Sequence, residues 1–218
     1  MVPVTGNFQA ETALNPLAQE ALLAAFESGW ADPKKISQSS ARAAILRNQS
    51  LENIGSRLGL RPDAIEIIGE PALGHFLAIA GLLSPAKNFA YTSIDKGKIR
   101  AIARAHSGPV QEWEVDSEGQ ILKTTTLADD TVISLQLANG ETGTIQNFRP
   151  HHKSQISVDA TASGPRLPLP ESWSTALFDA QSWAGPSGLG FLAINDSAYT
   201  YPLPRIAPIK SPGTYSLP

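Results

Sequence analysis

The sequence predicts an α/β fold of three layers, in which a mainly parallel, seven-stranded mixed sheet lies between helices. Segments with the patterns of strands and helices alternate along most of the chain, an arrangement that produces parallel sheets. Several strand-like segments are nearly continuous apolar runs, as in strands covered on both faces. Only eight residues separate Gln181 from Gly190, too few for a parallel crossover. The final strand is therefore predicted to run antiparallel to its predecessor.

The first two helices have recognisable ends. Asn15 followed by Pro16 is a capping residue before a proline at the first helical position, and Gly29 closes this helix. The second helix is predicted over Ser37–Leu58, with Gly59 as its C-terminal cap. Two later helices are predicted over Ala72–Leu83 and Lys96–His106.

The strands are predicted from short apolar runs between turn residues. They cover Ala64–Ile68, Phe89–Ser93, Val110–Val115, Thr131–Leu137, Gln155–Ala160, Ala176–Gln181 and Gly190–Ile194. Prolines at positions 202, 204, 208, 212 and 218 exclude a regular helix or a central strand from the C-terminal tail. We therefore expect a large domain over residues 1–200, with a helical part at 1–60 and a sheet core at 61–195, and an extended tail at 201–218.

The composition excludes several classes of protein. A net charge of -3 and a pI near 5.8 provide no basic footprint for nucleic acid and no polybasic patch for a membrane. The sequence contains no cysteine, which rules out disulfides, thiolate metal sites and cysteine nucleophiles. The longest apolar run, Phe76–Leu83, is too short to cross a bilayer, and the first residues carry no secretory signal pattern. We expect a cytoplasmic protein without a metal site.

Four short stretches have counterparts in one enzyme family. Leu137–Gln146 is similar to the motif ANNExGxxQ, Val158–Thr161 to HVDAxQ, and Gly185–Gly190 to GPKGxG. Phe76–Gly81 is similar to the end of the helix that follows a phosphate-binding loop. With these stretches in order over about residues 6–195, the chain resembles the cysteine desulfurase and class V aminotransferase family. The resemblance implies the large domain of a transferase that depends on pyridoxal phosphate, with a seven-stranded mixed sheet.

Two departures from the family concern architecture. Relatives continue into a smaller domain near Gly213-Thr214, where this chain stops, so we expect that domain to be missing. Only about 14 residues separate Gly140 from Gln155, where relatives have a helix. We expect this helix to be absent or reduced to a turn.

The catalytic lysine of the family, which forms a Schiff base with the cofactor, corresponds to Ser182 in this chain. Gln181 precedes it, where relatives have a histidine. A hydroxyl cannot form an imine, and no lysine lies between Lys153 and Lys210. Ser182 also lacks the G-x-S-x-G elbow of a serine hydrolase. A desulfurase further needs a cysteine, so we expect no such catalysis and no bound pyridoxal phosphate.

Most other positions that hold the cofactor in the family differ as well. In the phosphate loop Glu70 adds negative charge and Ala72 replaces a threonine. Asp179 replaces a phosphate-binding serine, and two carboxylates would repel a phosphate. The remodelled cleft is completed by Lys96 for a stacking histidine, Gly140 for an asparagine and Ala162 for a glutamine. Asp159, which pairs with the pyridine nitrogen in the family, is retained, and Thr214 matches a residue that reaches the neighbouring subunit's phosphate.

Some local interpretations stay open. Asp159 is either a vestigial cofactor contact or a strand-end acid that caps a turn. Lys96 with Asp179 and Glu70 forms either a charge-paired remnant or a pocket for a cationic ligand. His151-His152 would point to opposite faces of a strand, which disfavours a metal site.

The leading hypothesis is a catalytically inactive member of the family with an interaction or regulatory role. This hypothesis follows from a preserved scaffold with eroded cofactor positions. The resemblance also implies a homodimer, or a heterodimer with a related protein, because relatives of this fold type dimerise with their active sites at the subunit interface. An alternative is cofactor binding or desulfurase-like activity without a Schiff-base lysine, based on Asp159 and Thr214. A further alternative is a protein that binds a small molecule in the remodelled cleft.

Overall fold

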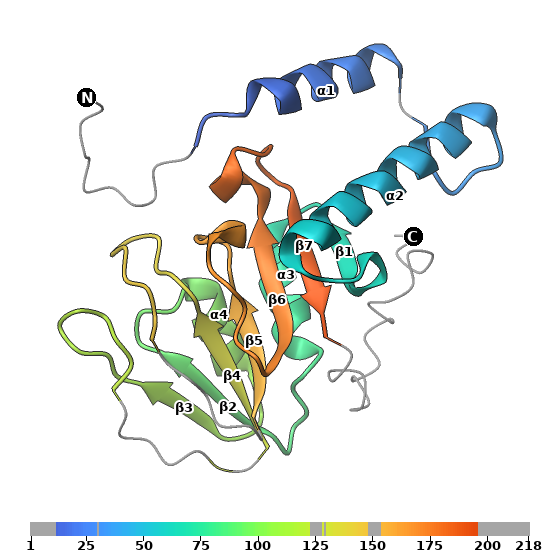
Figure 1. Ribbon diagram of the computed structural model, residues 1–218. Helices are drawn as coiled ribbons and strands as arrows, with labels where there is room; N and C mark the ends of the chain where they lie inside the picture. Colours follow the sequence, from blue (N-terminus) through green and yellow to red (C-terminus); the bar gives the residue numbers. More distant parts are fainter. Residues whose placement is uncertain (1–11, 30, 123–127, 129, 148–153, 196–218) are drawn as a thin grey trace, which may run out of the picture.

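The computed structural model describes residues 12–29, 31–122, 128, 130–147 and 154–195 (Figure 1). Its sheet has seven strands in the order β1-β7-β6-β5-β4-β2-β3. The strands are β1 Ile65–Ile68, β2 Asn88–Thr92, β3 Val110–Trp113, β4 Thr131–Gln136, β5 Gln155–Asp159, β6 Trp173–Asp179 and β7 Gly190–Ile194. Neighbouring strands are parallel except that β7 runs antiparallel to both β6 and β1. The predicted mixed sheet with an antiparallel final strand is confirmed.

The helices cover both faces of this sheet. The α-helices of the described residues are α1 Pro16–Glu27, α2 Gln38–Leu58, α3 Pro71–Ala80 and α4 Gly97–Ala105. Helices α3 and α4 pack on one face, where Ile79 and Ile99 join the apolar core formed with Phe89 and Leu192. Leu51, from the second half of α2, belongs to the core cluster on the other face. The three predicted layers are therefore present, and the cleft described below lies at one edge of the middle layer.

The predicted capping residues Asn15 and Gly59 occupy helix ends, and the structure adds Ser37 as the N-cap of α2. The Asn15 side chain accepts a hydrogen bond from the Leu17 amide at 2.9 Å, and Ser37 caps the start of α2. Gly59 ends α2 with a φ of 66°, in the left-handed region that favours glycine. These local signals could be read from the sequence because each one depends only on residues nearby in the chain.

Strand β6 differs from the prediction of Ala176–Gln181, because it begins at Trp173 and ends at Asp179. The polar residue Thr175 lies inside the strand since its hydroxyl is satisfied there, donating to the Ala78 carbonyl at 3.1 Å. At the other end, the Asp179 side chain caps a short 3-10 helix, η3, at Ala180–Trp183. Helix α3 is also shorter than predicted.

Between β4 and β5, the described residues 137–147 form turns and an isolated β-bridge rather than a helix. Asn139 organises a turn there, because its side-chain oxygen accepts from the amides of Glu141 and Thr142. Residues 148–153 and the predicted tail at 201–218 lie outside the described residues. Among the described helices, none is long and apolar enough to cross a membrane.

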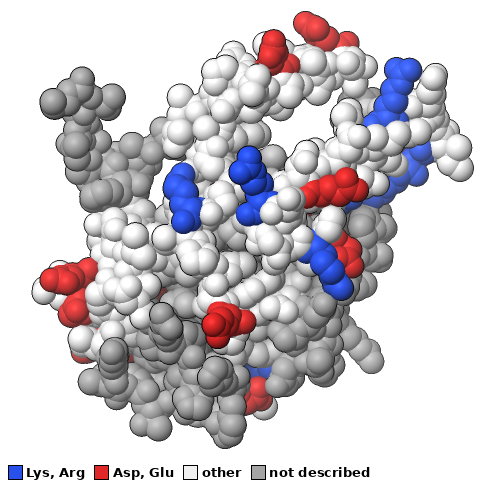
Figure 2. Space-filling model, in the orientation of Figure 1, with Lys and Arg blue, Asp and Glu red and all other residues white. Residues whose placement is uncertain are grey.

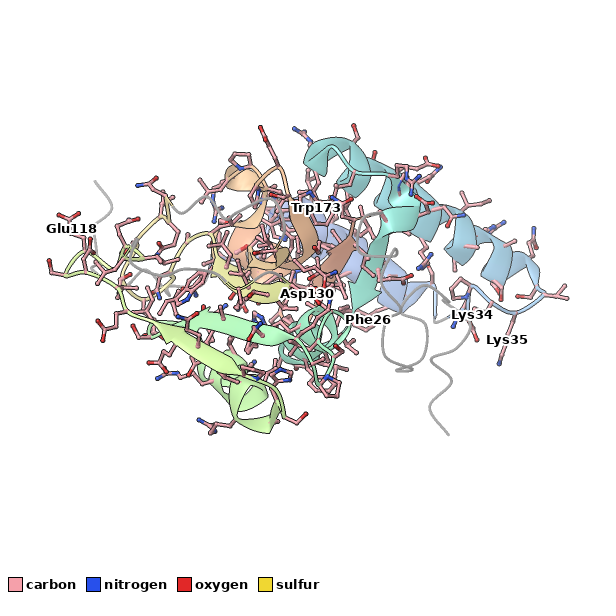
Figure 3. The ribbon with its side chains drawn as sticks, turned by 90° about the horizontal axis from the view of Figure 1, so that it is seen from below. Phe26, Lys34, Lys35, Glu118, Asp130 and Trp173 are labelled. Carbon is pink, nitrogen blue, oxygen red and sulfur yellow. The ribbon has the colours of Figure 1, made fainter. Side chains whose placement is uncertain are left out.

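Helix α1 and the first half of α2 form an arm, residues 16–50, that stands away from the sheet (Figure 1). No residue of α1 is buried, and Figure 2 shows open space between α1 and the body of the protein. In Figure 3, Lys34 and Lys35 lie at the outer end of this arm, whereas Glu118 lies at the opposite end of the molecule. Just before the arm, a main-chain bond joins the chain to the segment after η3: the Asn15 amide donates to the Ala184 carbonyl at 2.9 Å.

Candidate functional site

A cavity of about 550 Å³ lies at the carboxyl ends of β2, β4, β5 and β6. This edge of an open α/β sheet is where such folds bind ligands. The sequence-predicted positions Lys96, Gly140, Ala162, Asp179 and Ser182 line the cavity, together with Gln181. These six residues, which are far apart in the chain, thus lie around one cavity, whose lining also includes residues such as Asp95, Arg100 and Asn139 that the sequence analysis did not single out.

The centre of the cleft is an ion pair between Lys96 and Asp159. Asp159 is the last residue of β5 and is fully buried, while Lys96 is the N-cap of α4 and reaches across from that helix. The Lys96 Nζ lies 3.1 Å from Asp159 Oδ2 and also donates a hydrogen bond to the Thr161 hydroxyl. Thr161 in turn donates its amide and its hydroxyl to Asp159 Oδ1, at 2.9 and 2.5 Å. Asp159 thus caps the turn after β5 and forms an ion pair with Lys96.

The charge state of this cluster follows from its surroundings. Burial acts to raise the pKa of Asp159, but Lys96, His75 and the hydrogen bonds from Thr161 outweigh it and hold the pKa at about 2. His75 Nε2 approaches Asp159 Oδ2 from α3 at 3.8 Å. Burial lowers the pKa of His75 despite the nearby carboxylate, so the imidazole is neutral at pH 7. The ion pair at the centre of the cleft is therefore formed by Lys96 and Asp159, while His75 is a neutral neighbour.

Sequence reasoning missed two residues of this region, His75 and Asp95. Burial raises the pKa of Asp95 to about 7, and the negative charge of Asp159 adds to the effect. The Thr92 amide donates to Asp95 Oδ2 at 2.9 Å. A signal for Asp95 existed, because it lies two positions after the end of the predicted strand Phe89–Ser93. His75 precedes the buried Ala78 by three positions, so helical spacing places it on the face of α3 toward the sheet.

Ser182, which the resemblance places at the position of the family's lysine, lies in η3. Its hydroxyl donates to the Asp179 main-chain carbonyl at 2.8 Å. Arg166 fixes the same segment from outside, because its guanidinium donates to the carbonyls of Ser182 at 2.8 Å and Ala162 at 3.2 Å. The Gln181 amide donates to the Asp179 carboxylate at 3.0 Å. These contacts hold η3 in place. The Ser182 hydroxyl donates to a main-chain carbonyl in this arrangement and not to a side chain that could act as a base.

Glu70 and Ala72 are not among the residues that line the cavity. The Glu70 carboxylate accepts the Ala72 amide at 2.9 Å and so caps the start of α3. Lys96 pairs with Asp159, not with Glu70 or Asp179 as the sequence interpretation had it. Thr214 and His151-His152 fall outside the described residues, and within those residues no group of three acidic or histidine side chains is placed to hold a metal.

This set of groups does not fit pyridoxal phosphate bound in the way the resemblance implies. The cofactor aldehyde needs an amine, whereas Ser182 offers a hydroxyl. Asp159 would have to face the ring nitrogen, whereas it already faces an ammonium group. The amide of Ala72, at the N-terminus of α3 where a phosphate would bind, is taken by Glu70.

Comparison with solved structures identifies the fold. A NifS-like protein superposes with a TM-score of 0.76 at 20% identity, covering 88% of this chain and 59% of that one. SspA in complex with cysteine gives 0.79 at 20% identity, covering 87% and 60%. A NifS-like protein from Rickettsia africae gives 0.70 at 15% identity, covering 92% and 59%. The chain thus has the NifS-like fold that the sequence motifs predicted, and it spans about 60% of the length of these structures. No family model and no curated protein sequence matches it.

Proposed function

We propose that this chain is a non-catalytic protein with a NifS-like fold that acts by binding another protein chain, either a second copy or a related protein. The observation that carries the proposal is the cleft in which Lys96 neutralises Asp159 while Ser182 stands in place of the catalytic lysine. Such a cleft keeps the scaffold of the fold, but the lysine that lines it, Lys96, is paired with Asp159, so it offers neither an amine at the Schiff-base position nor a free carboxylate at Asp159.

The arm supports a role in protein–protein contact. In α1, Leu17, Leu23 and Phe26 are 75, 55 and 79% exposed. A helix of 12 residues is marginal by itself in water, and its stability comes from packing an apolar face. Exposed apolar side chains on a standing helix are typical of an interaction surface. Burial against a partner would stabilise both the helix and the complex.

The two helices of the arm carry opposite charges, which would favour association of two copies. Helix α1 carries Glu20 and Glu27 and no basic residue, whereas the first half of α2 carries Arg42 and Arg47. An antiparallel meeting of two arms would bring the acidic helix of one copy beside the basic half-helix of the other. This complementarity is the reason for placing a second copy or a close relative first among partners.

Native mass spectrometry of the purified chain, with and without pyridoxal phosphate, tests the proposal. The expected spectrum contains a dimer, or a complex with a related chain when one is co-expressed, and no cofactor adduct. A monomer under all conditions would overturn the interaction role. A stoichiometric pyridoxal phosphate adduct would overturn the non-catalytic role and restore residual enzymology as the explanation.

A second candidate function is the binding of a small molecule, favoured by the cavity of about 550 Å³ with its polar lining. The titratable acid Asp95 lines that cavity beside Lys96. A metabolite that stays bound through purification and appears as a defined mass shift in the same spectra would favour this function. Its loss in a variant of the cleft, such as Arg100→Ala, would place the molecule there.

A further inference from the structure

We infer that Lys96 is a built-in occupant of a cation site at Asp159, and that its side chain closes this site to flat cationic nitrogen compounds and small amines. The inference deepens the proposed function, since it names the residue that changes the specificity of the cleft. It rests on the position of the ammonium group and on the state of the carboxylate behind it.

Asp159 requires a cation where it lies. Its side chain is 3% exposed, and an ionised carboxylate in such surroundings is costly unless it is paired. Among the described residues, the ion pairs of Asp159 are with Lys96 and, at 3.8 Å, with His75. The histidine is neutral at pH 7 because burial lowers its pKa. Lys96 therefore supplies the charge that keeps Asp159 ionised.

Lys96 stands on the side of Asp159 that opens to the cavity. Its side chain is 36% exposed and lines the cleft, while the carboxylate behind it is closed from solvent. The Lys96 stem leads from the start of α4 toward Thr161, at the end of β5. Truncating that stem would join the space it fills to the cavity and leave Asp159 facing the cleft.

The ion pair between Lys96 and Asp159 leaves one carboxylate oxygen without a hydrogen bond, which favours a ligand in place of the Lys96 ammonium group. Asp159 Oδ1 accepts two bonds from Thr161, whereas the buried Oδ2 makes no hydrogen bond despite its ion pair with Lys96. A cation that carries an N–H directed at Oδ2 would gain both the charge and the hydrogen bond. The nearby carboxyl groups of Asp95 and Asp179 disfavour a ligand with a negative group. The site therefore fits a compact ammonium ion or a protonated nitrogen ring.

The test uses Lys96→Ala in the full chain with two probes. Ethylammonium chloride replaces the end of the lost side chain, and pyridoxamine offers a ring nitrogen without an aldehyde that could react with other lysines. We expect both probes to raise the Tm of Lys96→Ala but not of wild type. By calorimetry pyridoxamine should bind the variant about tenfold or more tightly than wild type, as a charged hydrogen bond implies.

Two matched variants make the outcome specific. Lys98→Ala removes an exposed lysine from the same helix and should respond like wild type. Lys96→Ala/Asp159→Asn removes both charges, should fold without a probe, and should lose the gain in binding. If Lys96→Ala alone does not fold, refolding in ethylammonium chloride, compared with sodium chloride, should restore its circular dichroism.

The results separate this inference from the proposed function. A folded Lys96→Ala that gains no affinity for either probe overturns the inference and leaves the non-catalytic role intact. A variant that stays unfolded in ethylammonium chloride overturns it as well. Binding of pyridoxamine to wild type as tightly as to Lys96→Ala would show that Lys96 does not close the site. A pyridoxal phosphate adduct of wild type contradicts the proposed function instead.

Discussion

Asp95 and Asp159 are both buried carboxyl groups at the carboxyl edge of the sheet, yet their surroundings differ. Asp159 faces an ammonium group and two donors from Thr161, which keep its pKa at about 2 in spite of burial. Asp95 forms no ion pair with any residue that the structure describes, so burial dominates and raises its pKa to about 7. Two neighbouring acids whose pKa values are shifted in opposite directions are frequent in catalytic sites. In this cleft Lys96, which lowers the pKa of Asp159, also lies between Asp159 and the cavity.

Replacing Asp95 by Asn tests the environment of this residue. The folded-state pKa of Asp95, about 7, lies above the value of 3.8 that is usual for an aspartate in an unfolded chain. Between these two values the folded chain binds more protons than the unfolded chain, so this carboxyl makes stability fall as pH rises from about 4 to about 7. We expect Asp95→Asn to be more stable than wild type by about 1–3 kcal/mol at pH 8 and close to it at pH 4.

Urea unfolding of both proteins across this pH range gives the difference in unfolding free energy directly. Asp63→Asn, at an exposed acid, serves as the control and should show no such trend. A constant difference between Asp95→Asn and wild type from pH 4 to pH 8 would contradict the raised pKa.

Some of the residues that line the cleft could be named from the sequence, but their partners could not. Ser182 and Lys96 were located through motifs that anchor nearby positions. The partner of Lys96 was predicted as Asp179 or Glu70, whereas it is Asp159. The reason is geometric, because the reach of a lysine depends on which strand ends lie beside the start of α4. The order of strands in the sheet, with β4 between β2 and β5, cannot be predicted from the local sequence of any one strand.

At the scale of elements, the strands and helices whose signals are local were predicted well. Short apolar runs located all seven strands, the Asn15 cap located the start of α1, and Gly59 located the end of α2. The start of β6 was missed because Ser174 and Thr175 look like turn residues in the sequence. Their hydroxyls are satisfied only across the structure, by bonds to β5 and α3. A buried polar residue in a strand is thus recognisable only once its partners are known.

The turn between β6 and β7 depends on a close approach that a side chain would prevent. A Cβ atom at Gly185 would lie 2.7 Å from Ala180 Cβ and 2.8 Å from the Ala180 carbonyl oxygen. The Gly185 amide also donates to that carbonyl at 2.8 Å, so the two segments cannot separate freely. We expect Gly185→Ala to lower the free energy of unfolding by about 1–3 kcal/mol.

Thermal and urea unfolding would measure this effect, with Gly69→Ala as the matched control. A Cβ at Gly69 meets nothing within 4 Å, so that variant should stay within about 0.5 kcal/mol of wild type. Equal stability of the two variants would mean that the turn relaxes without cost, against the expectation from the packing.

At the scale of the whole molecule, the sheet with α3, α4 and the second half of α2 forms the body, and residues 16–50 form the arm (Figure 1). Helical periodicity predicted the helices of the arm but not its position, because an apolar stripe normally indicates a face packed on the core. In α1 that expectation fails, since none of its residues is buried. Apolar surface left open by the fold is what the proposed partner would cover.

This separation of body and arm predicts that association and stability can be changed independently. Leu17→Ser, Leu23→Ser and Phe26→Ser combined alter only exposed side chains of α1. The free energy of unfolding of the body should therefore change by no more than about 0.5 kcal/mol per site. The dimer fraction should fall strongly, because the apolar area that a partner would bury is lost. Light scattering over a concentration series measures the dimer, and urea unfolding measures the body.

Two controls separate the surface from the core. Gln19→Ser changes a polar residue of the same helix and should leave the dimer intact. Phe178→Ala removes a fully buried ring and should cost about 3–5 kcal/mol of stability. If the triple substitution lowers stability as much as Phe178→Ala, the arm belongs to the folded body in solution. If it leaves both stability and dimer unchanged, α1 is not the contact surface, and association must use another face.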